Sequence, residues 1–398
     1  MNPGITSLQP YPFEKLAQLK QGLSPPAGKS AIDLSIGEPK HKTPGFILEE
    51  IKAHLTSAAV YPKTRGQEKL REVIANWLCK RFRLNENSIH PDKHILPVNG
   101  TREALFAFAQ CIIDQSKSNP VVISPNPFYQ IYEGAALLAG AQPVFVNCIA
   151  ENNFVPDFSS VTADIWNDCQ LVYICTPGNP TGTVLGRETL AQLLDFADKH
   201  DFVIASDECY SEIYLDEDHP PTGLLQVAAE TGRNDYRRCI VFHSLSKRSN
   251  VPGMRSGFVA GDQELIESFF KYRTYHGCAM AGFTQAASIA AWQDESHVIQ
   301  NRMLYREKFA AVLEILAPVM NVQQPDAGFY LWPEVPISDQ AFTQQLFSKQ
   351  NVTVLPGSFL SRTANGINPG NNRLRIALVA SIDECVEAAA RIRDQINT

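Results

Sequence analysis

Leu171-Val-Tyr-Ile-Cys-Thr-Pro-Gly-Asn-Pro-Thr-Gly182 begins with a short apolar run and ends in a cluster of turn-forming residues. Over residues 188–200, apolar residues then recur at the spacing of an α-helix. A second apolar run at 202–206 ends at Asp207. Strand, helix and strand in this order form the unit from which parallel sheets with crossover helices are built. The stretch therefore predicts an α/β fold in which Asn179 and Asp207 lie at the carboxyl ends of strands, where open α/β sheets bind ligands.

The same alternation continues on both sides of this stretch. Apolar runs predict further strands at 121–124, 143–147, 239–243 and 257–261, and helical periods predict helices at 68–82 and 263–272. After about residue 283 the pattern changes to a long helix at 298–316, short strands at 329–332, 352–355 and 374–379, and helices at 340–349 and 382–396. We therefore expect a mostly parallel central sheet wrapped by helices, followed by a smaller α+β region.

The composition excludes several classes of protein. The 398 residues carry a net charge of -7 without a long Lys/Arg cluster, which argues against nucleic-acid binding. The amino terminus has no basic leader, and no apolar run approaches the roughly 20 residues that span a bilayer. The nine cysteines include no Cys-x-x-Cys pair. These observations predict a cytoplasmic, reduced protein with small-molecule ligands and no membrane partner.

Lys247 lies in the motif Ser244-Leu-Ser-Lys-Arg-Ser-Asn-Val-Pro-Gly-Met-Arg255. A lysine becomes a covalent catalyst when burial and cationic neighbours lower its pKa, because the free amine condenses with an aldehyde. The hydroxyls of Ser244 and Ser246 and the guanidinium of Arg255 suit a phosphate anchor, so the motif suggests pyridoxal 5'-phosphate. The motif also matches the S-x-x-K of serine penicillin-binding enzymes, but neither S-D-N nor K-T-G follows.

Further polar residues follow predicted strands or lie within them. Asp207 can pair with a protonated ring nitrogen, and Tyr210 lies three residues beyond it. Alternation places Arg373 and Arg375 on one face of the last short strand, where one of them can clamp a carboxylate. Taken singly, these residues also have ordinary structural interpretations: a cap for the aspartate, a core position for the tyrosine, and a surface ion pair for the arginine.

Together these stretches resemble the class I aminotransferases of fold type I over nearly the whole chain. The family pattern is met in order by Ser35-Ile-Gly37-Glu-Pro, residues 61–66, Gly100-Thr-Arg102, Tyr129, Asn179-Pro-Thr-Gly182, Asp207 with Tyr210, Ser244-Leu-Ser-Lys247, Arg255 and Arg375. One departure is Ser256, where the family usually has an aliphatic residue. The resemblance implies pyridoxal 5'-phosphate as cofactor, a large cofactor-binding domain at 44–285, and a small domain built from 1–43 and 286–398.

The resemblance also implies roles for the site residues. Lys247 would hold the cofactor and move the proton, Asp207 would keep the pyridine nitrogen protonated, and Tyr210 and Asn179 would bond the ring oxygen. Arg375 would bind the substrate α-carboxylate with help from Asn179 and the backbone of Gly37. The phosphate is expected to bind to Gly100, Thr101, Arg102, Ser244, Ser246, Arg255 and, across the interface of a homodimer, Tyr61. Tyr129 is expected to stack on the cofactor ring, with Phe128 as the alternative.

No metal site is expected, because Pro91 separates His90 from His94 and no third ligand is apparent.

The substrate is suggested by less diagnostic segments. Residues 272–280 and the opening 5–20 resemble bacterial N-succinyldiaminopimelate aminotransferases of lysine and cell-wall biosynthesis. The implied reaction transfers an amino group between glutamate and N-succinyl-2-amino-6-oxopimelate, and Arg273 and His276 are candidates for the distal end of the substrate. Aspartate, alanine or aromatic transamination, or a carbon–sulfur lyase, are alternatives that share the same cofactor site. A non-catalytic ligand sensor would need an appended DNA-binding module, which the chain lacks.

Overall fold

The computed structural model describes residues 4–397, and its strands form a large sheet and two small ones. The strands are β1 Ile32–Asp33, β2 Ile95–Val98, β3 Val121–Asn126, β4 Gln142–Asn147, β5 Cys169–Cys175, β6 Val203–Asp207, β7 Cys239–Ser244, β8 Gly257–Gly261, β9 Tyr330–Leu331, β10 Val352–Thr353, β11 Leu355–Pro356 and β12 Leu374–Ala377. The helices are α1 Gly4–Ser7, α2 Pro12–Leu19, α3 Gly45–Ala53, α4 Glu68–Arg81, α5 Pro91–His94, α6 Thr101–Ile112, α7 Ile131–Leu138, α8 Ala163–Asp168, α9 Arg187–His200, α10 Leu224–Glu230, α11 Leu245–Arg248, α12 Gln263–His276, α13 Gly282–Gln293, α14 Ser296–Leu316, α15 Asp339–Gln350 and α16 Ile382–Ile396. Short 3₁₀ turns are η1 Leu55–Ala59, η2 Ala150–Asn152, η3 Phe158–Ser160, η4 Pro252–Met254 and η5 Gly357–Leu360.

The large sheet has the strand order β2-β8-β7-β6-β5-β3-β4. Pairs from β4 to β7 are parallel, whereas β8 pairs antiparallel with both β7 and β2. The mostly parallel α/β sheet expected from the sequence is therefore confirmed. β2 was not predicted from the sequence, because this strand is only Ile-Leu-Pro-Val and a proline argues against a strand interior.

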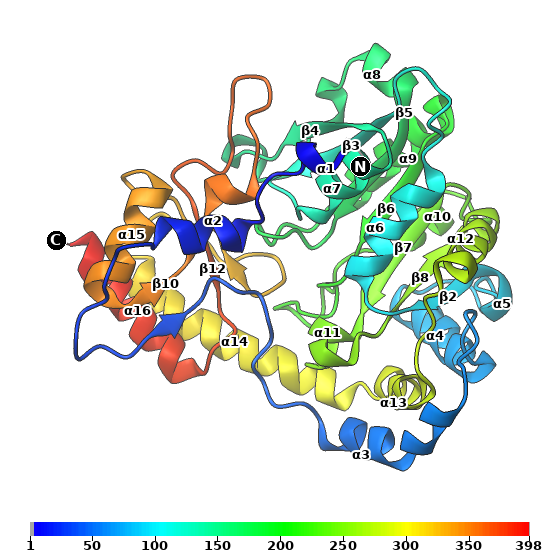
Figure 1. Ribbon diagram of the computed structural model, residues 1–398, viewed down its shortest axis with the longest axis horizontal. Coiled ribbons are helices and arrows are strands. Elements are labelled where there is room, and N and C mark those ends of the chain that lie inside the picture. The colour runs from blue at the N-terminus through cyan, green and yellow to red at the C-terminus, as the bar shows by residue number, and fades with distance from the viewer. Residues whose placement is uncertain (1–3, 398) are drawn as a thin grey trace.

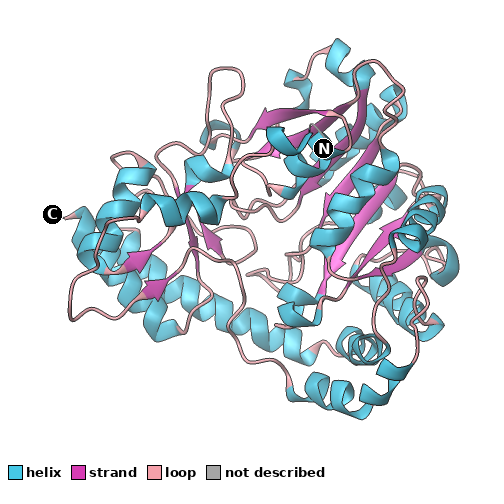
Figure 2. Cartoon of the chain, viewed as in Figure 1, coloured by secondary structure: helices cyan, strands magenta, loops and turns pink. Residues whose placement is uncertain are grey.

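Helices cover both faces of the large sheet, as Figure 2 shows. All residues of β5 are buried, which is typical of a parallel strand between two helical layers. Val172 and Ile174 join a core with α4, α9, α10 and α13. Leu171 and Tyr173 point to the opposite face and join a core with α6, α7 and α12. The strict alternation of side chains along β5 thus divides the interior into two apolar layers.

A third core lies around the small sheets. It joins Ile32 and Leu34 near the amino terminus with residues of α14, α15 and α16, among them Phe309, Leu346 and Ile392. The pairing of β1 with β10 is parallel, so the amino-terminal segment adds to a sheet formed by the carboxyl-terminal part. In Figure 1, α14 runs from the small sheets to α13 below the large sheet. We propose that the chain divides into a large domain at 44–285 and a small domain of 1–43 with 286–398.

From β3 the chain adds β4 on one side, and from β5 it adds β6 and β7 on the other side. The order in which strands are added therefore reverses between β3 and β5. Ligands of open α/β sheets bind outside the carboxyl ends of strands at such a switch point. No helix within residues 4–397 is both long and apolar enough to cross a membrane.

Candidate active site

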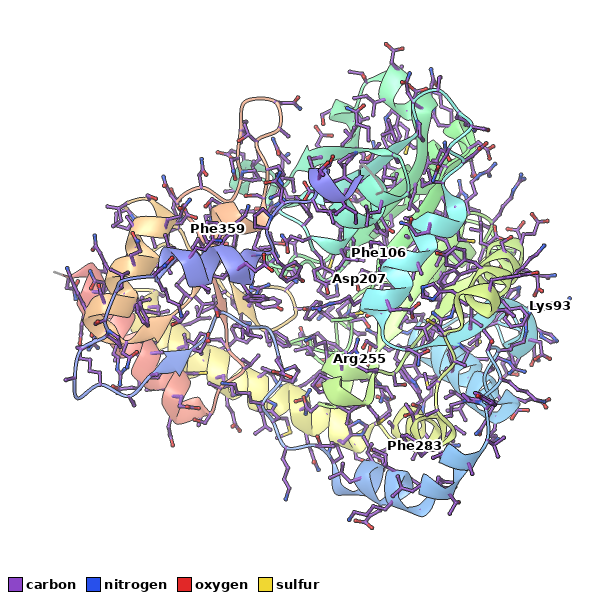
Figure 3. All side chains as sticks on the ribbon, viewed as in Figure 1. Lys93, Phe106, Asp207, Arg255, Phe283 and Phe359 are labelled. Carbon is purple, nitrogen blue, oxygen red and sulfur yellow. The ribbon has the colours of Figure 1, made fainter. Side chains whose placement is uncertain are left out.

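A cavity of about 550 Å³ lies at the carboxyl ends of β5, β6 and β7. Figure 3 labels Asp207 and Arg255, which lie in the middle of the view between the large sheet and the part that carries Phe359. The predicted site residues that line this cavity are Gly37, Thr101, Arg102, Tyr129, Asn179, Asp207, Tyr210, Ser244, Ser246, Lys247, Arg255 and Arg375. Residues far apart in the sequence thus meet at one place, as the motif order predicts.

Lys247 is held on α11, the single helical turn after β7. Ser244 caps this turn by accepting a hydrogen bond of 3.1 Å from the backbone N–H of Ser246. Burial lowers the pKa of Lys247 to about 8, and the nearby cations Arg375 and Arg102 act in the same direction. Its Nζ donates to the carbonyl of Gly37. A larger fraction of the lysine is therefore the free, nucleophilic amine near neutral pH than for a solvated lysine.

Asp207 forms the floor of the cavity at the end of β6. Only 4% of this residue is exposed, and its Oδ2 accepts a hydrogen bond of 2.7 Å from the hydroxyl of Tyr132. Burial raises the pKa of Asp207, while hydrogen bonds from Cys209 and Tyr132 act against that rise. A buried carboxyl group without a cation within the described residues is suited to a basic nitrogen supplied by a ligand.

Tyr132 was not identified from the sequence. It lies on α7, and its ring stacks on Tyr173 with centroids 4.7 Å apart. This stacking fixes the hydroxyl against Asp207, because both tyrosines are buried. The only sequence signal was its position three residues after Tyr129, near the start of the helix that follows.

One end of the cavity carries donors that suit an anion. Gly100 has φ +87°, and a Cβ there would lie 2.2 Å from Nη2 of Arg255. Glycine therefore lets the guanidinium of Arg255 lie against the start of α6, where free N–H groups and the helix dipole attract negative charge. The hydroxyls of Thr101, Ser244 and Ser246 line the same cavity. Arg255 has no acidic partner within the described residues and donates to the carbonyl of Pro252 at 2.8 Å.

Arg375 lies in β12, opposite this anion-binding end. It is 5% exposed, and donates to Asn179 Oδ1 at 3.0 Å and to the carbonyl of Ser35 at 2.7 Å. Its neighbours in the strand, Leu374 and Ile376, face the small-domain core, as the alternation predicts. Its Nε has no hydrogen-bond partner within residues 4–397, and no carboxylate pairs with the guanidinium. A buried guanidinium in this state is a receptor for a ligand carboxylate.

Tyr330, which the sequence analysis also missed, completes this part of the site. Its hydroxyl lies 2.9 Å from that of Tyr210, and its ring lies under the guanidinium of Arg375 at 4.7 Å. A Cβ at Gly37 would lie 1.9 Å from the Tyr330 hydroxyl, so only glycine allows this approach. No sequence pattern identified Tyr330 as a site residue, because it belongs to a two-residue strand.

Tyr129 and Phe128 lie in different surroundings. Phe128 is 1% exposed and stacks on Phe145 in the core with centroids 4.8 Å apart. Tyr129 lines the cavity and accepts a hydrogen bond of 2.5 Å from Nε of Arg102. Of the two rings, only Tyr129 is placed to contact a ligand. Arg102 also lines the cavity, and its guanidinium forms no ion pair with an acid among residues 4–397.

Besides Phe128 and Gly100, whose neighbours Tyr129 and Thr101 line the cavity, three more candidates from the sequence lie outside it. Tyr61 is 99% exposed. Arg273 is fully buried and pairs with Glu103 at 2.6 Å, which leaves it unavailable to a substrate in the cavity. His276 lies beside Cys278 at the end of α12. Ser256, the departure from the family pattern, points away from the site and bonds Ser288 at 2.7 Å.

The donor set fits pyridoxal 5'-phosphate. The cavity combines an amine of lowered pKa, a buried acid and a cup of hydroxyls, helix N–H groups and a guanidinium. These groups match an aldehyde, a basic ring nitrogen and a phosphate. The guanidinium of Arg375 remains for a second anionic ligand.

Comparisons with known proteins agree with this chemistry. The model of the family "Aminotransferase class I and II" matches residues 29–392. The LL-diaminopimelate aminotransferase of Aquifex aeolicus (strain VF5) is 32% identical over 394 residues, which cover 97% of this chain and 97% of that protein. The protein of the same name from Dehalococcoides mccartyi is 31% identical over 396 residues and covers 98% and 97%.

Solved structures show the same architecture. An aminotransferase from Neisseria meningitidis Z2491 is 50% identical, with a TM-score of 0.95 and coverage of 98% of this chain and 99% of that one. The aminotransferase AspB from Helicobacter pylori 26695 is 34% identical, with a TM-score of 0.90 and coverage of 98% and 99%. The chain belongs to the class I and II aminotransferases, a family that depends on pyridoxal 5'-phosphate.

Proposed function

We propose that this aminotransferase moves an amino group between glutamate and N-succinyl-2-amino-6-oxopimelate, which yields N-succinyldiaminopimelate. The observation that carries the proposal is that, besides Arg255 at the phosphate end, two more guanidinium groups without acidic partners within residues 4–397, those of Arg375 and Arg102, line one cavity with Lys247. A substrate with carboxylates at both ends of a long chain complements this pair of cations.

We propose catalytic roles for the side chains that line the cavity. When bound, pyridoxal phosphate would supply an electron sink for the negative charge that develops as the substrate α-proton leaves. Lys247 would hold the cofactor and move the proton at the substrate α-carbon. Asp207 would keep the ring nitrogen protonated. Tyr210 and Asn179 would donate to the ring oxygen.

The opposite end of the cavity holds the phosphate. The N–H groups of Gly100 and Thr101, at the start of α6, donate to it. Ser244, Ser246 and Arg255 complete the cup, and Tyr129 stacks on the ring. We assign Arg102 to the substrate end instead of the phosphate, because its guanidinium lies 6.0 Å from the ring centroid of Tyr11, which also lines that end.

Arg375 binds the α-carboxylate in both half-reactions. Asn179 and the carbonyl of Ser35 fix the guanidinium, so its fork is oriented before a ligand enters. The backbone of Gly37 lies beside Lys247, which donates to its carbonyl. The same receptor therefore serves glutamate and the longer amino acid in turn.

The distal part of the substrate meets a mixed surface. Tyr11, Phe13 and Leu360 supply apolar contacts, and Arg102 supplies a positive charge. These features suit the methylenes and a remote carboxylate of the succinyl group. Glu38 also lines the cavity, and its carboxylate has no cationic partner within residues 4–397. This acid favours a second candidate, free LL-diaminopimelate, whose distal ammonium it would bind, and relatives of this chain carry that substrate in their names.

A panel of amino donors assayed with 2-oxoglutarate tests the proposal. N-Succinyldiaminopimelate should have the highest kcat/KM, above LL-diaminopimelate, aspartate, alanine and aromatic amino acids. A higher value for LL-diaminopimelate would favour the second candidate. A higher value for a short or aromatic amino acid would reject the diaminopimelate class and keep the aminotransferase. Release of pyruvate and ammonia from cysteine-type substrates without an acceptor would instead favour a carbon–sulfur lyase.

We also propose a homodimer in which Tyr61 reaches the phosphate of the partner. Tyr61 is 99% exposed, and the adjacent Val60 and Leu55 are 71% and 52% exposed. Such a group of apolar side chains on one segment is suited to an interface. A second copy of the chain would cover them and bring Tyr61 to a site that its own chain does not let it reach.

Mixing two inactive variants tests this arrangement. Tyr61→Ala and Lys247→Ala should regain partial activity when reassembled as heterodimers, because one of the two sites then carries neither change. Heterodimers that form but stay inactive would place Tyr61 outside the partner's site.

A further inference from the structure

A second group of chemically reactive side chains lies at the carboxyl end of α12, outside the cavity. It consists of Glu103, His276 and Cys278, whose ligand atoms all lie within 4.8 Å of one another. Nδ1 of His276 is 2.9 Å from Sγ of Cys278. None of the three lines the active-site cavity. The proposed function uses none of them.

The backbone turn at Gly277 creates this cluster. Gly277 has φ +87° and caps α12, and its N–H donates to the carbonyl of Arg273 at 2.9 Å. The left-handed turn reverses the chain directly after His276, so Cys278 lies beside the imidazole. Glu103 comes from the first turn of α6, which packs against α12. Two elements that are far apart in the sequence therefore supply the three groups.

We propose that Glu103, His276 and Cys278 bind a zinc ion. A thiolate, an imidazole and a carboxylate are the donor types that zinc prefers, and three protein ligands leave a fourth position for water. Tetrahedral zinc separates such ligand atoms by about 3.4 to 3.6 Å, given the usual bond lengths. His276 Nδ1 and Cys278 Sγ, 2.9 Å apart, would move apart by a fraction of an ångström to reach this separation, and the carboxylate oxygen of Glu103 lies within 4.8 Å of both.

The carboxylate of Glu103 stays available although it is paired. Nη1 of Arg273 lies 2.6 Å from each carboxylate oxygen. A carboxylate offers about four acceptor positions, so it can hold the guanidinium and a metal together. Arg273 also donates to Asn99 at 3.1 Å and is fully buried, which fixes the direction of the carboxylate. It thereby acts as the orienting partner that metal-bound carboxylates commonly have.

The charge around Cys278 also favours a cation. The ligand atoms of Glu103 and Cys278 lie within 4.8 Å of each other, so a divalent cation between them would replace the thiol proton and bind both groups. His276 adds a neutral donor at the surface.

The site would link α12 to the turn that begins α6. Asn99 donates to the carbonyl of Ala279 at 3.1 Å and directly precedes Gly100, where α6 starts. Zinc would therefore stabilise the loop 277–279 against the helix that lines the active site. We assign it a structural role, because it lies outside the active-site cavity and would join two elements of the fold.

Calorimetric titration of the chelator-treated holoenzyme with zinc chloride tests the proposal. One equivalent should bind per chain. Glu103→Gln, His276→Ala and Cys278→Ser should each weaken the affinity by at least about tenfold. Cys111→Ser and His219→Ala change a thiol and an imidazole elsewhere and should leave it unchanged, while the cofactor is present in every variant. Equal affinity in all five variants would overturn the proposal.

X-ray absorption of the zinc-loaded wild-type enzyme provides a test that needs no variant. One sulfur at about 2.3 Å, with the remaining ligands nitrogen or oxygen at about 2.0 to 2.2 Å, is the expected coordination. A shell without sulfur would contradict the assignment, and so would a failure to retain zinc after gel filtration.

Discussion

The two ends of the active-site cavity differ in how their polar side chains are held. At the inner end, Asp207 is bonded by Tyr132, and Arg375 is bonded by Asn179 and the backbone. At the outer end, Arg102 has one hydrogen bond and Glu38 has no side-chain partner in the described chain. The inner side chains come from strands and the turns after them, whereas Arg102 comes from the second residue of α6 and Glu38 from an amino-terminal loop.

This difference separates the reaction from the choice of substrate. Groups that are fixed before a ligand enters lose little freedom when they act, so the inner end suits steps common to all substrates. Groups without partners gain their contacts from the ligand, so the outer end suits discrimination between substrates. Changes at the inner end should therefore impair every substrate, and changes at the outer end should impair only some.

Replacing Lys247 should have the largest effect. Lys247→Ala removes both the covalent attachment and the proton carrier, so kcat should fall by at least about a thousandfold with every donor. Single-turnover absorbance with several donors measures this loss. Retained turnover with any one donor would break the assignment of Lys247 to the common chemistry.

The next largest effect is expected at Asp207. Asp207→Asn keeps the shape of the side chain but removes the charge that stabilises a protonated ring nitrogen, so proton abstraction should slow by about a hundredfold or more. The deuterium isotope effect on the half-reaction should increase, because this step then limits the rate. A near-normal half-reaction would leave Asp207 with a structural role only.

A smaller loss should follow Arg375→Lys. A two-pronged contact with the α-carboxylate becomes a single one, which costs about 2 to 4 kcal/mol in kcat/KM. Glutamate and N-succinyldiaminopimelate should be affected alike, because both present an α-carboxylate. If only one of them is weakened, Arg375 does not serve both half-reactions.

Tyr132→Phe should have a moderate effect at the inner end. It removes a hydrogen bond to a charged group, which is worth about 1.5 to 3 kcal/mol, and leaves the ring stacking on Tyr173 intact. We expect kcat to fall about tenfold or more while KM changes little, because the tyrosine positions Asp207 and does not touch substrate. An unchanged kcat would show that Asp207 needs no such support.

The pH dependence of cofactor binding tests the lowered pKa of Lys247. Only the unprotonated amine reacts with the aldehyde, so the rate of reconstitution of the apoenzyme should rise with pH and level off above about 8. For a solvated lysine the rise would continue towards its ordinary pKa near 10.5. Stopped-flow absorbance at a series of pH values distinguishes these two profiles.

The sequence predicted the large sheet and the order of the motifs, because β5 and β6 are continuous apolar runs that end in polar residues. It also placed Asn179, Asp207 and Lys247 correctly in one cavity. Tyr132 and Tyr330 were not identified from the sequence, because their roles in the site come from hydrogen bonds to Asp207 and Tyr210, which are far away in the sequence. An apolar or aromatic residue in a short element carries no local pattern that reveals such a contact.

The outer end was predicted least well. The amino-terminal residues Tyr11 and Phe13 line the cavity only because their segment packs against residues 355–360, and no local sequence pattern reveals such a long-range contact. Arg273 was expected near the substrate, but the structure buries it in an ion pair with Glu103. The charge of an isolated arginine in a sequence does not tell which acid, if any, will lie next to it after folding.

The most direct test of the division between the two ends compares two variants with two amino donors. N-Succinyldiaminopimelate carries remote carboxylates, whereas norleucine has a similar α-amino acid end and no distal charge. We predict that Arg375→Lys slows the single-turnover half-reaction of both donors by a similar factor, and that Arg102→Ala slows only that of N-succinyldiaminopimelate. An equal loss for both donors in Arg102→Ala would contradict the account, because Arg102 would then belong to the common chemistry.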